Sequence, residues 1–442
     1  MQFQNLQMKR HFVSGKFIVG IDPSKEKYDA AVINPNGILQ RTTFAFQNNH
    51  DGVQSQLWFF IRQRIKSCSP EDTIFAIEAS CNLWQKLAGY ITSQGFTVVM
   101  INPLSTHKAR VLINHSFSKT DAKDALVIAN AGREGYFDLY RIHPDPVKAM
   151  HELSITYDKL KKSLSQAKLR LRALVEQVFP EFCVILKLNT HTALYLLERY
   201  IIPQDFLNAN ILETIQGMGK VSRKQHGLKT LKKLQEAAKN SIGLSMDEEQ
   251  IRAVRMSRDA WVAMIHTLQI QQGRILEQLI TMTKSCPYFE ILTSIKGISD
   301  ISAALFIAET RGLDGFQHYK QIEAFAGLGL KHSDSGKYRG YRHISHIGNN
   351  RLRSIIYLMT VETKNHIPEI RIKYLNRQLR QDRYRRNIVS CSSNLLKLIM
   401  ALVKENRRYE FREESVKELE KLENKIQSIQ EKRTKKQYKK AS

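Results

Sequence analysis

Four acidic residues have the types and the spacing that a divalent-cation site needs. Asp22 and Glu78 each end a short apolar run that reads as a buried strand. Asp121 and Asp124 lie three residues apart in a segment that reads as a helix, so their carboxylates would share one face. Carboxylates held together repel each other unless a cation balances them, and such hard oxygen ligands favour Mg²⁺ or Mn²⁺. These residues therefore predict a magnesium or manganese site.

The chemistry of such a site is the cleavage of phosphodiester bonds. Two ions about 4 Å apart stabilise both the attacking and the leaving oxygen. Asp22 and Glu78 would lie at the carboxyl edge of a sheet, where the loops of open α/β folds converge. Taken singly, each acid has a plainer interpretation: a strand-end Asp often makes a turn, and Asp121 can stabilise the start of its helix. The order of all four resembles the RNase H-like (RuvC-type) nuclease fold.

Short strands alternate with helices around these acids. The expected strands are 16–22, 27–33, 38–46, 73–78 and 97–101. The expected helices are 51–66, 83–93 and 121–133. Strands joined by helices indicate an α/β sheet with both faces covered. We expect this domain to span 16–145, after a leader of residues 1–15 that shows no clear periodic pattern.

Two long apolar seams follow the α/β domain. The first runs from Leu153 to Val178, with members spaced four and three residues apart in turn. The second runs from Trp261 to Met282 with the same spacing and one polar member, Gln272. The seams predict two long helices that form an antiparallel pair, a dimerising coiled coil or both, or that simply pack on a globular core.

The C-terminal two thirds of the chain read as helical. We expect a helical and coiled-coil region at 146–285, a helical domain at 286–403 and a charged tail at 404–442. Residues 181–246, between the two seams, read as further helices. The tail has apolar residues at helical spacing and ends in a run of lysines and arginines, which is either solvated or in contact with phosphates.

The balance of charges points to a polyanionic partner. The chain of 442 residues holds 68 Lys and Arg against 42 Asp and Glu, a net charge of +26. A surface this basic attracts nucleic acid, and an acidic membrane surface is the weaker alternative. Five widely spread cysteines with no CxxC pair exclude a zinc finger and argue against a disulfide framework. Charge interrupts every apolar run before membrane-spanning length, so we expect a cytoplasmic protein with no membrane partner.

Two sets of motifs resemble those of the DEDD-type transposases of the insertion-sequence 110 family, whose relatives include the Piv site-specific invertases. The first set is Gly20-Ile-Asp22, Ile77-Glu78-Ala79-Ser80 and Lys119-Thr-Asp121-Ala-Lys-Asp124-Ala. The second set lies at 292–303, 325–328, 334–336 and 347–353, in the family's order. The resemblance covers residues 16–400, and it implies a transposase or DNA recombinase.

The resemblance implies roles for particular residues. The first domain would bind Mg²⁺ through the four acids, and the C-terminal domain would supply a catalytic serine. By its position that serine is Ser335, whose activated hydroxyl would attack DNA and form a protein-linked intermediate. Without the family, a serine in Asp-Ser-Gly reads as a turn residue, and Ser333 offers an alternative hydroxyl. The family usually has proline where Leu330 stands, which leaves the loop before Ser335 open to a different geometry.

Basic residues near the serine are suited to binding DNA phosphates. They are Lys337, Arg339, Arg342, Arg351 and Arg353. Phosphate contacts position DNA without reading its sequence, and no helix with a base-reading set of side chains stands out. The resemblance implies that a noncoding bridge RNA specifies donor and target DNA by base pairing, as in other guided systems. Because recombination handles several strands at once, we expect a homo-oligomer, a dimer or a tetramer.

The sequence thus predicts an RNase H-like α/β domain, a coiled-coil middle and a helical serine-bearing domain, in an enzyme that moves an insertion sequence. Three alternatives stay open. A Piv-type site-specific invertase would carry the same motifs. A RuvC-like metal-dependent junction nuclease would need the acids without Ser335. A non-enzymatic DNA- or RNA-binding scaffold would explain the charge and the seams, but it would leave the four acids without a role.

Overall fold

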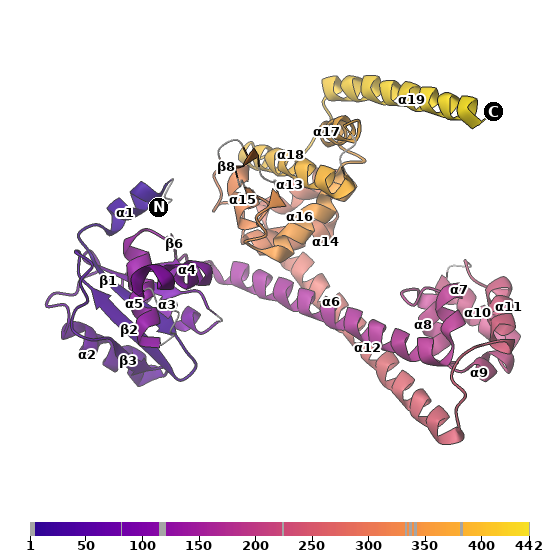
Figure 1. The fold of residues 1–442 in the computed structure, drawn as a ribbon, viewed down its shortest axis with the longest axis horizontal. Helices are drawn as coiled ribbons and strands as arrows, with labels where there is room; N and C mark the ends of the chain where they lie inside the picture. The colour runs from indigo at the N-terminus through magenta and orange to yellow at the C-terminus, as the bar shows by residue number, and fades with distance from the viewer. Residues whose placement is uncertain are drawn as a thin grey trace. The chain divides into compact units, whose positions relative to one another are not determined.

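The computed structural model describes residues 5–80, 82–114, 121–222, 225–331, 334–335, 338–339, 343–380 and 383–441. Within these ranges it describes the backbone alone for residues 111–114, 121–122, 331, 334–335, 338–339 and 429–441. The chain forms two compact units, Met1–Ile142 and His143–Ser442, called unit 1 and unit 2 below (Figure 1).

Unit 1 is built on a six-stranded mixed sheet with the order β3-β2-β1-β4-β5-β6. The strands are β1 (Phe17–Pro23), β2 (Lys27–Ile33), β3 (Phe44–Gln47), β4 (Thr73–Glu78), β5 (Thr97–Ile101) and β6 (Phe137–Leu139). β1, β4 and β5 run parallel, and the remaining neighbours pair antiparallel. This sheet with its helices is consistent with the predicted RNase H-like fold.

Alternate residues of the central strands belong to two apolar cores, one on each face of the sheet. Val19 is buried in the core that α2 (Leu57–Arg62) and α3 (Trp84–Ser93) complete. Its neighbour Ile18 is buried in the opposite core, which α5 (Asp121–Arg133) completes. Since successive side chains of a strand point to opposite faces, both faces are covered, as the sequence predicted.

Gly20 lets α5 lie directly against the backbone of β1. A β-carbon on Gly20 would come within 2.3 Å of the Ala125 carbonyl oxygen and 2.4 Å of the Ala129 amide nitrogen. Farther along the helix, Gly132 lies against Ile18, which comes earlier in the strand. The helix therefore runs antiparallel to β1, and this direction places the first turn of α5 over the C-terminal end of the strand.

Parts of unit 1 differ from the sequence prediction. The leader forms a regular helix, α1 (Leu6–Val13), which the side chain of Asn5 caps. The third strand is shorter than expected, because Arg41 takes a left-handed φ of 61° just before it. The helix expected at 51–66 consists of a π-helical turn, η1 (Gly52–Gln56), followed by α2.

Unit 2 is built on two long helices, α6 (Asp145–Val178) and α12 (Glu248–Lys284), which pack side by side (Figure 1). The start of α6 and the end of α12 share a core in which Met150 is buried. The end of α6 and the first half of α12 share another, in which Leu171 and Ile265 are buried. The helices are therefore antiparallel, which is one arrangement that the seams predicted, whereas a dimerising coiled coil stays a prediction.

Shorter helices complete these two cores. The helices between α6 and α12 are α7 (Pro180–Ile185), α8 (His191–Leu197), α9 (Pro203–Leu207), α10 (Ile211–Ser222) and α11 (Leu228–Lys239). Those after α12 are α13 (Pro287–Ser294), α14 (Asp300–Thr310), α15 (Tyr319–Phe325), α16 (Asn350–Thr363), α17 (Pro368–Gln378), α18 (Tyr384–Lys404) and α19 (Glu413–Ala441). We call the core that the first set completes the arm core. The core that the second set completes, up to α18, is called the C-terminal core.

Helix α18 is the central helix of the C-terminal core. By length and composition it could also cross a membrane, but half of its most apolar stretch is buried inside the protein. Cys391 and Leu395 on this helix have no exposed surface. The cysteines that the structure describes, Cys68, Cys183, Cys286 and Cys391, are free thiols.

Substitution of Gly20 by alanine tests the contact between α5 and β1. The added methyl group overlaps backbone atoms of α5, which cannot move independently of the helix, so we expect Gly20→Ala to lower the free energy of unfolding by about 1–3 kcal/mol or more. Urea denaturation measures this loss. Gly89→Ala is the matched control, since a β-carbon there meets nothing within 4 Å and α3 should gain up to about 1 kcal/mol. Equal stability of the two variants would contradict the tight packing.

Candidate active site

Two of the predicted acids lie at the ends of neighbouring parallel strands. Ile21 of β1 pairs with Ile77 of β4, and Asp22 and Glu78 follow these two residues directly. Residues in register share a face of the sheet, so both acids lie on one face at the carboxyl edge. Asp22 is half-buried, and Glu78 is 9% exposed. The structure thus brings together the two strand-end acids that the sequence singled out.

Helix α4 (Pro103–Asn114) connects Glu78 to the third acid, Asp124. The hydroxyl of Thr106 donates to Glu78 Oε2 at 3.0 Å. One turn later, Arg110 donates from Nε and Nη2 to the two oxygens of Asp124, at 2.6 and 2.7 Å. Residues four apart on a helix lie about 5–6 Å apart on one face. Glu78 and Asp124 therefore lie against the same face of α4, about one turn apart.

The fourth acid, Asp121, is the first residue of α5. Its side chain lies outside the part of the chain whose side chains the structure describes. Its backbone position is fixed by the packing of α5 on β1 at Gly20, which places the first turn of the helix over the strand end that carries Asp22. Its place in the cation site stays a prediction.

A further acid at this edge, Asp29, was not predicted from the sequence. Asp29 lies directly opposite Asp22 in the β1–β2 pair, and side chains so placed share a face with β-carbons about 5 Å apart. It is 7% exposed, and its Oδ2 accepts no hydrogen bond, although Lys27 Nζ lies 3.3 Å away. The signal in the sequence was an acid that interrupts an otherwise apolar strand.

The chemistry of this edge fits a hard divalent cation. Its oxygen donors are carboxylates, the ligands that such an ion prefers, and the cation that lies beside Asp29 in this structure is the ammonium group of Lys27. Among the described side chains, no three His, Cys, Asp or Glu lie close enough together to hold an ion. Both oxygens of Asp124 are bound by Arg110, so a cation held by Asp124 would have to share or replace these contacts.

The predicted serine lies in unit 2, in a segment of small antiparallel ladders. The outer ladder pairs β7 (Leu330–Lys331) with β10 (His343–Ile344), and the inner ladder pairs β8 (Asp334–Ser335) with β9 (Tyr338–Arg339). Ser335 is paired with Tyr338 in the inner ladder. Ser335 thus lies in strand β8, where the sequence without its family suggested a turn. Ser333 lies outside the described residues.

The two ends of this segment, which we call the serine segment (329–348), are clamped together. The amide of Ser345 donates to the Gly329 carbonyl at 2.7 Å, and that of His346 donates to the Gly327 carbonyl at 3.1 Å. Gly348 has a φ of 146°, and a β-carbon there would lie 2.5 Å from the Phe325 carbonyl oxygen. Glycine at this position is required by both the conformation and the close approach.

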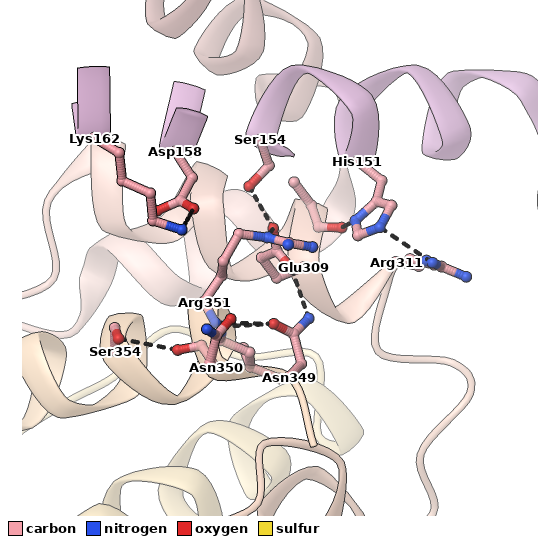
Figure 2. A network of polar contacts seen from close by, with 12 residues as sticks. His151, Ser154, Asp158, Lys162, Glu309, Arg311, Asn349, Asn350, Arg351 and Ser354 are labelled. Carbon is pink, nitrogen blue, oxygen red and sulfur yellow. Dashed lines mark hydrogen bonds and ion pairs between the residues drawn. The ribbon is translucent and has the colours of Figure 1, made fainter. Parts of the chain in front are cut away.

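A buried carboxylate lies at the exit of the serine segment (Figure 2). Glu309 of α14 has no exposed surface, and it accepts hydrogen bonds from Ser154 Oγ at 2.8 Å, Asn349 Nδ2 at 2.6 Å and Arg351 Nε at 2.7 Å. Burial opposes ionisation, but the hydrogen bonds from Arg351, Asn349 and Ser154 outweigh it and lower the pKa of Glu309. Glu309 was not predicted from the sequence. The signal in the sequence was an acid at the end of the apolar run of α14.

The basic residues predicted to bind DNA have different surroundings. Arg351 is bound to Glu309, and 27% of its side chain is exposed. Arg353 donates from Nη1 to the carbonyl oxygens of Ala326 at 2.9 Å and His346 at 3.4 Å. Arg339 is described by its backbone alone, and Lys337 and Arg342 lie outside the described residues. Phosphate binding by these five residues stays a prediction.

Two hollows on unit 2 meet on α6. The first has a volume of about 230 Å³ and lies between α6, α14 and α16. The second has a volume of about 900 Å³ and lies between α6, α12 and the segment around α7. Tyr157 and Lys161 line both hollows, so the two adjoin along α6, and we call the pair of hollows the α6 groove. Its charged lining residues are Lys161, Lys162, Lys168, Arg172, Lys187, Arg351 and one acid, Asp158.

His151, next to this network, is held in its neutral form. Its Nδ1 lies 3.2 Å from the Ala308 carbonyl oxygen, and its Nε2 lies 3.1 Å from Arg311 Nη2. A ring with its proton on Nδ1 satisfies both contacts, since Nδ1 then donates and Nε2 accepts. Burial, and then the charge of Arg311, lower the pKa of His151.

Comparison with known proteins places both sites inside matched regions. Residues 19–180 match a transposase family model of the DEDD, IS110 type, and residues 289–375 match a model of the transposase IS116/IS110/IS902 family. The four acids lie in the first match, and Ser335 lies in the second. The motif sets found in the sequence therefore lie within regions that match two transposase family models.

Individual relatives point the same way. The chain is 22% identical over 300 residues to the 43.6 kDa protein of insertion element IS110 from Streptomyces coelicolor, across 67% of this chain and 73% of that protein. It is 30% identical over 160 residues to the pilin gene-inverting protein of Moraxella lacunata, and over 159 residues to that of Moraxella bovis. These two alignments span 36% of this chain and 47% of each inverting protein, so less than half of each is matched.

Acidification tests the neutral state of His151. The folded pKa lies below the ordinary 6.5, so the unfolded chain takes up a proton first as the pH falls. The stability that His151 contributes is complete above pH 6.5 and is lost as the pH falls through the folded pKa. We expect His151→Gln to reduce the loss of unfolding free energy below pH 6.5, measured by urea titrations. His366→Gln, at an exposed site, is the control and should leave that loss unchanged.

Proposed function

Because this chain belongs to the IS116/IS110/IS902 family of transposases, we propose that it cuts and rejoins DNA to move an insertion sequence. The observation that carries the proposal is the arrangement of the acids in unit 1. Asp22 and Glu78 end neighbouring strands, and α4 and α5 bring Asp124 to the same edge. Such an edge is where a phosphodiester-cleaving site is expected in this kind of sheet.

The four acids hold the divalent cation in this proposal. Mg²⁺ bound by Asp22, Glu78, Asp121 and Asp124 would promote ionisation of the attacking hydroxyl and stabilise the leaving oxygen. The protein's own part is to keep the carboxylates at fixed positions. Thr106 orients Glu78, and Arg110 orients Asp124 through hydrogen bonds to both of its oxygens.

Ser335 is the nucleophile in this proposal. Its hydroxyl oxygen attacks phosphorus and loses its proton to a base, while the bond from phosphorus to a sugar oxygen breaks and that oxygen takes up a proton. The DNA is then joined to the protein through a phosphodiester. A DNA hydroxyl attacks this linkage in turn and releases Ser335, so the strands are rejoined without ATP. The match of 289–375 to the second family model supports this role.

The partners in this proposal are donor DNA, target DNA and a noncoding bridge RNA that pairs with them, in a cytoplasmic homo-oligomer. The α6 groove supports the binding of a phosphate backbone, because six cations and one acid line it. Lys161 and Arg172 lie eleven residues apart, about 16 Å along an α-helix. This length corresponds to about five base pairs of duplex DNA.

A second candidate function is site-specific inversion of a DNA segment. The likeness to the pilin gene-inverting proteins favours it, and the same acids and serine would serve both reactions. The two functions differ in the DNA sites that are joined, not in the chemistry at phosphorus. A junction nuclease without covalent linkage would not use Ser335.

The serine assignment predicts a protein-linked DNA intermediate. Protein, Mg²⁺, donor and target DNA and the RNA transcribed from the element's flank are incubated and run on denaturing gels before and after protease treatment. We expect a slow DNA band that protease removes, that Ser335→Ala abolishes and that Ser333→Ala retains. Asp22→Asn should reduce its formation by about a hundredfold or more, because a group that stabilises the reacting charge is lost. Cleavage that persists in Ser335→Ala without linked DNA would show a plain nuclease.

The α6 groove predicts a specific salt dependence of DNA binding. In the triple variant Lys161→Gln, Lys168→Gln and Lys187→Gln, the slope of log affinity against log salt should fall by about 0.9 for each lost duplex contact. The control replaces three exposed lysines of the arm core, Lys229, Lys232 and Lys233, so the change in net charge is the same. Binding of duplex DNA and of RNA is measured separately. The same fall in both variants would show that only the net charge matters.

A further inference from the structure

Glu309 is a carboxylate in a buried position, where burial alone would disfavour its ionised form. It closes an apolar stretch of α14, it has no exposed surface, and Ser154, Asn349 and Arg351 all donate to it (Figure 2). Moving an ion pair into the interior costs several kcal/mol for each ion, and well-packed apolar residues in its place are often at least as stable. A gain in stability is therefore a weak explanation for the ion pair between Glu309 and Arg351. A requirement for fixed geometry at this position is a better explanation.

The donors to Glu309 lie where the serine segment ends and α16 begins. Asn349 follows the segment directly, and its Oδ1 accepts hydrogen bonds from the amides of Arg351 and Leu352 at 3.0 and 3.1 Å. The amide of Asn349 donates to the Phe325 carbonyl at 2.8 Å. Asn349 thus caps α16 with its side-chain oxygen. Its backbone amide donates a hydrogen bond to Phe325, shortly before the serine segment, and its side-chain nitrogen donates one to Glu309.

The entry of the serine segment is tied to the same place. Arg353, one turn into α16, donates to the Ala326 carbonyl at 2.9 Å, and His346 donates to the Gly327 carbonyl at 3.1 Å. Entry and exit therefore meet at the start of α16. Glu309 is the buried anchor under this start, because it binds both Asn349 and Arg351.

Ser154 connects this anchor to α6. Ser154 is 2% exposed, and its hydroxyl donates to the oxygen of Glu309 that also accepts from Arg351. Ser154 also lines the α6 groove, one turn before Asp158 and two turns before Lys162. One carboxylate thus joins a groove-lining residue to the exit of the serine segment.

We propose that Glu309 is a positioning residue, which fixes the serine segment through Asn349 and Arg351 and ties it to α6 through Ser154. The proposal rests on the proposed role of Ser335 in catalysis. Glu309 itself does not touch the reacting atoms. Its role is to hold the base of the segment in one position relative to the groove on α6.

Glu309→Gln tests this role, since glutamine keeps the size of the side chain and removes its charge. Hydrogen exchange at the amides of Ser345, His346 and Asn349 should become about ten- to a hundredfold faster, because hydrogen bonds to a charged group are lost at the base of the segment. Exchange in α18 should not change. At saturating DNA, the rate of protein-linked DNA formation should fall about ten- to a hundredfold, with DNA affinity within about twofold of the wild type.

Two further variants make the test decisive. Glu290→Gln is the matched control, because Glu290 forms an exposed ion pair with Arg408 in the same unit. It should leave exchange and rate unchanged. Ser154→Ala keeps the buried ion pair and removes one neutral donor, so it should fold even if Glu309→Gln does not. It should accelerate exchange at the same three amides about fivefold or more.

Unchanged exchange at these amides in both Glu309→Gln and Ser154→Ala would overturn the proposal. Equal loss of protection in α18 in both variants would also overturn it, because Glu309 would then support the whole core and not the segment. Failure of the serine assignment looks different. In that case the wild type yields no protein-linked DNA, or Ser335→Ala still forms it, while the exchange data continue to decide whether Glu309 holds the segment.

Discussion

The acidic edge of unit 1 depends on one contact, the packing of α5 on the bare backbone of β1 at Gly20. Because no side chain separates helix and strand there, the first turn of α5 lies over the end of the strand that carries Asp22. Helix α4 completes the edge, since Thr106 and Arg110 on one of its faces bind an acid of the sheet and an acid of α5. The sheet alone brings two acids together, and the close helix adds Asp124 beside them.

Both units fix an almost fully buried carboxylate with an arginine from another helix. Asp124 is held by Arg110 of the preceding helix, and Glu309 is held by Arg351 at the start of a later one. Pairs of this kind add little net stability, because both ions lose their water, but they tolerate few alternative geometries. Each pair lies beside residues for which the proposed chemistry requires fixed positions, the acids in unit 1 and the serine segment in unit 2.

Local patterns in the sequence predicted most elements of unit 1, although not α4 or β6, and the order of the motifs. The strand ends at Asp22 and Glu78, the helix at Asp124 and the two long seams follow from alternation and heptad spacing, and the structure has them. Contacts between distant segments could not be predicted, since no local pattern encodes them. The partners of Glu309 and the clamped base of the serine segment depend on such contacts.

Helix α6 belongs to both cores of unit 2, and its 34 residues correspond to a rod about 51 Å long. Its first turns are buried with the C-terminal core and its last turns with the arm core. No flexible linker separates these two parts of the helix, so the orientation of one core about the helix axis fixes the orientation of the other. One residue inserted midway would turn everything beyond it by about 100°, whereas an insertion of seven or eleven residues would restore the alignment to within about 20°. The length of this helix can therefore change in evolution by such steps but not by single residues.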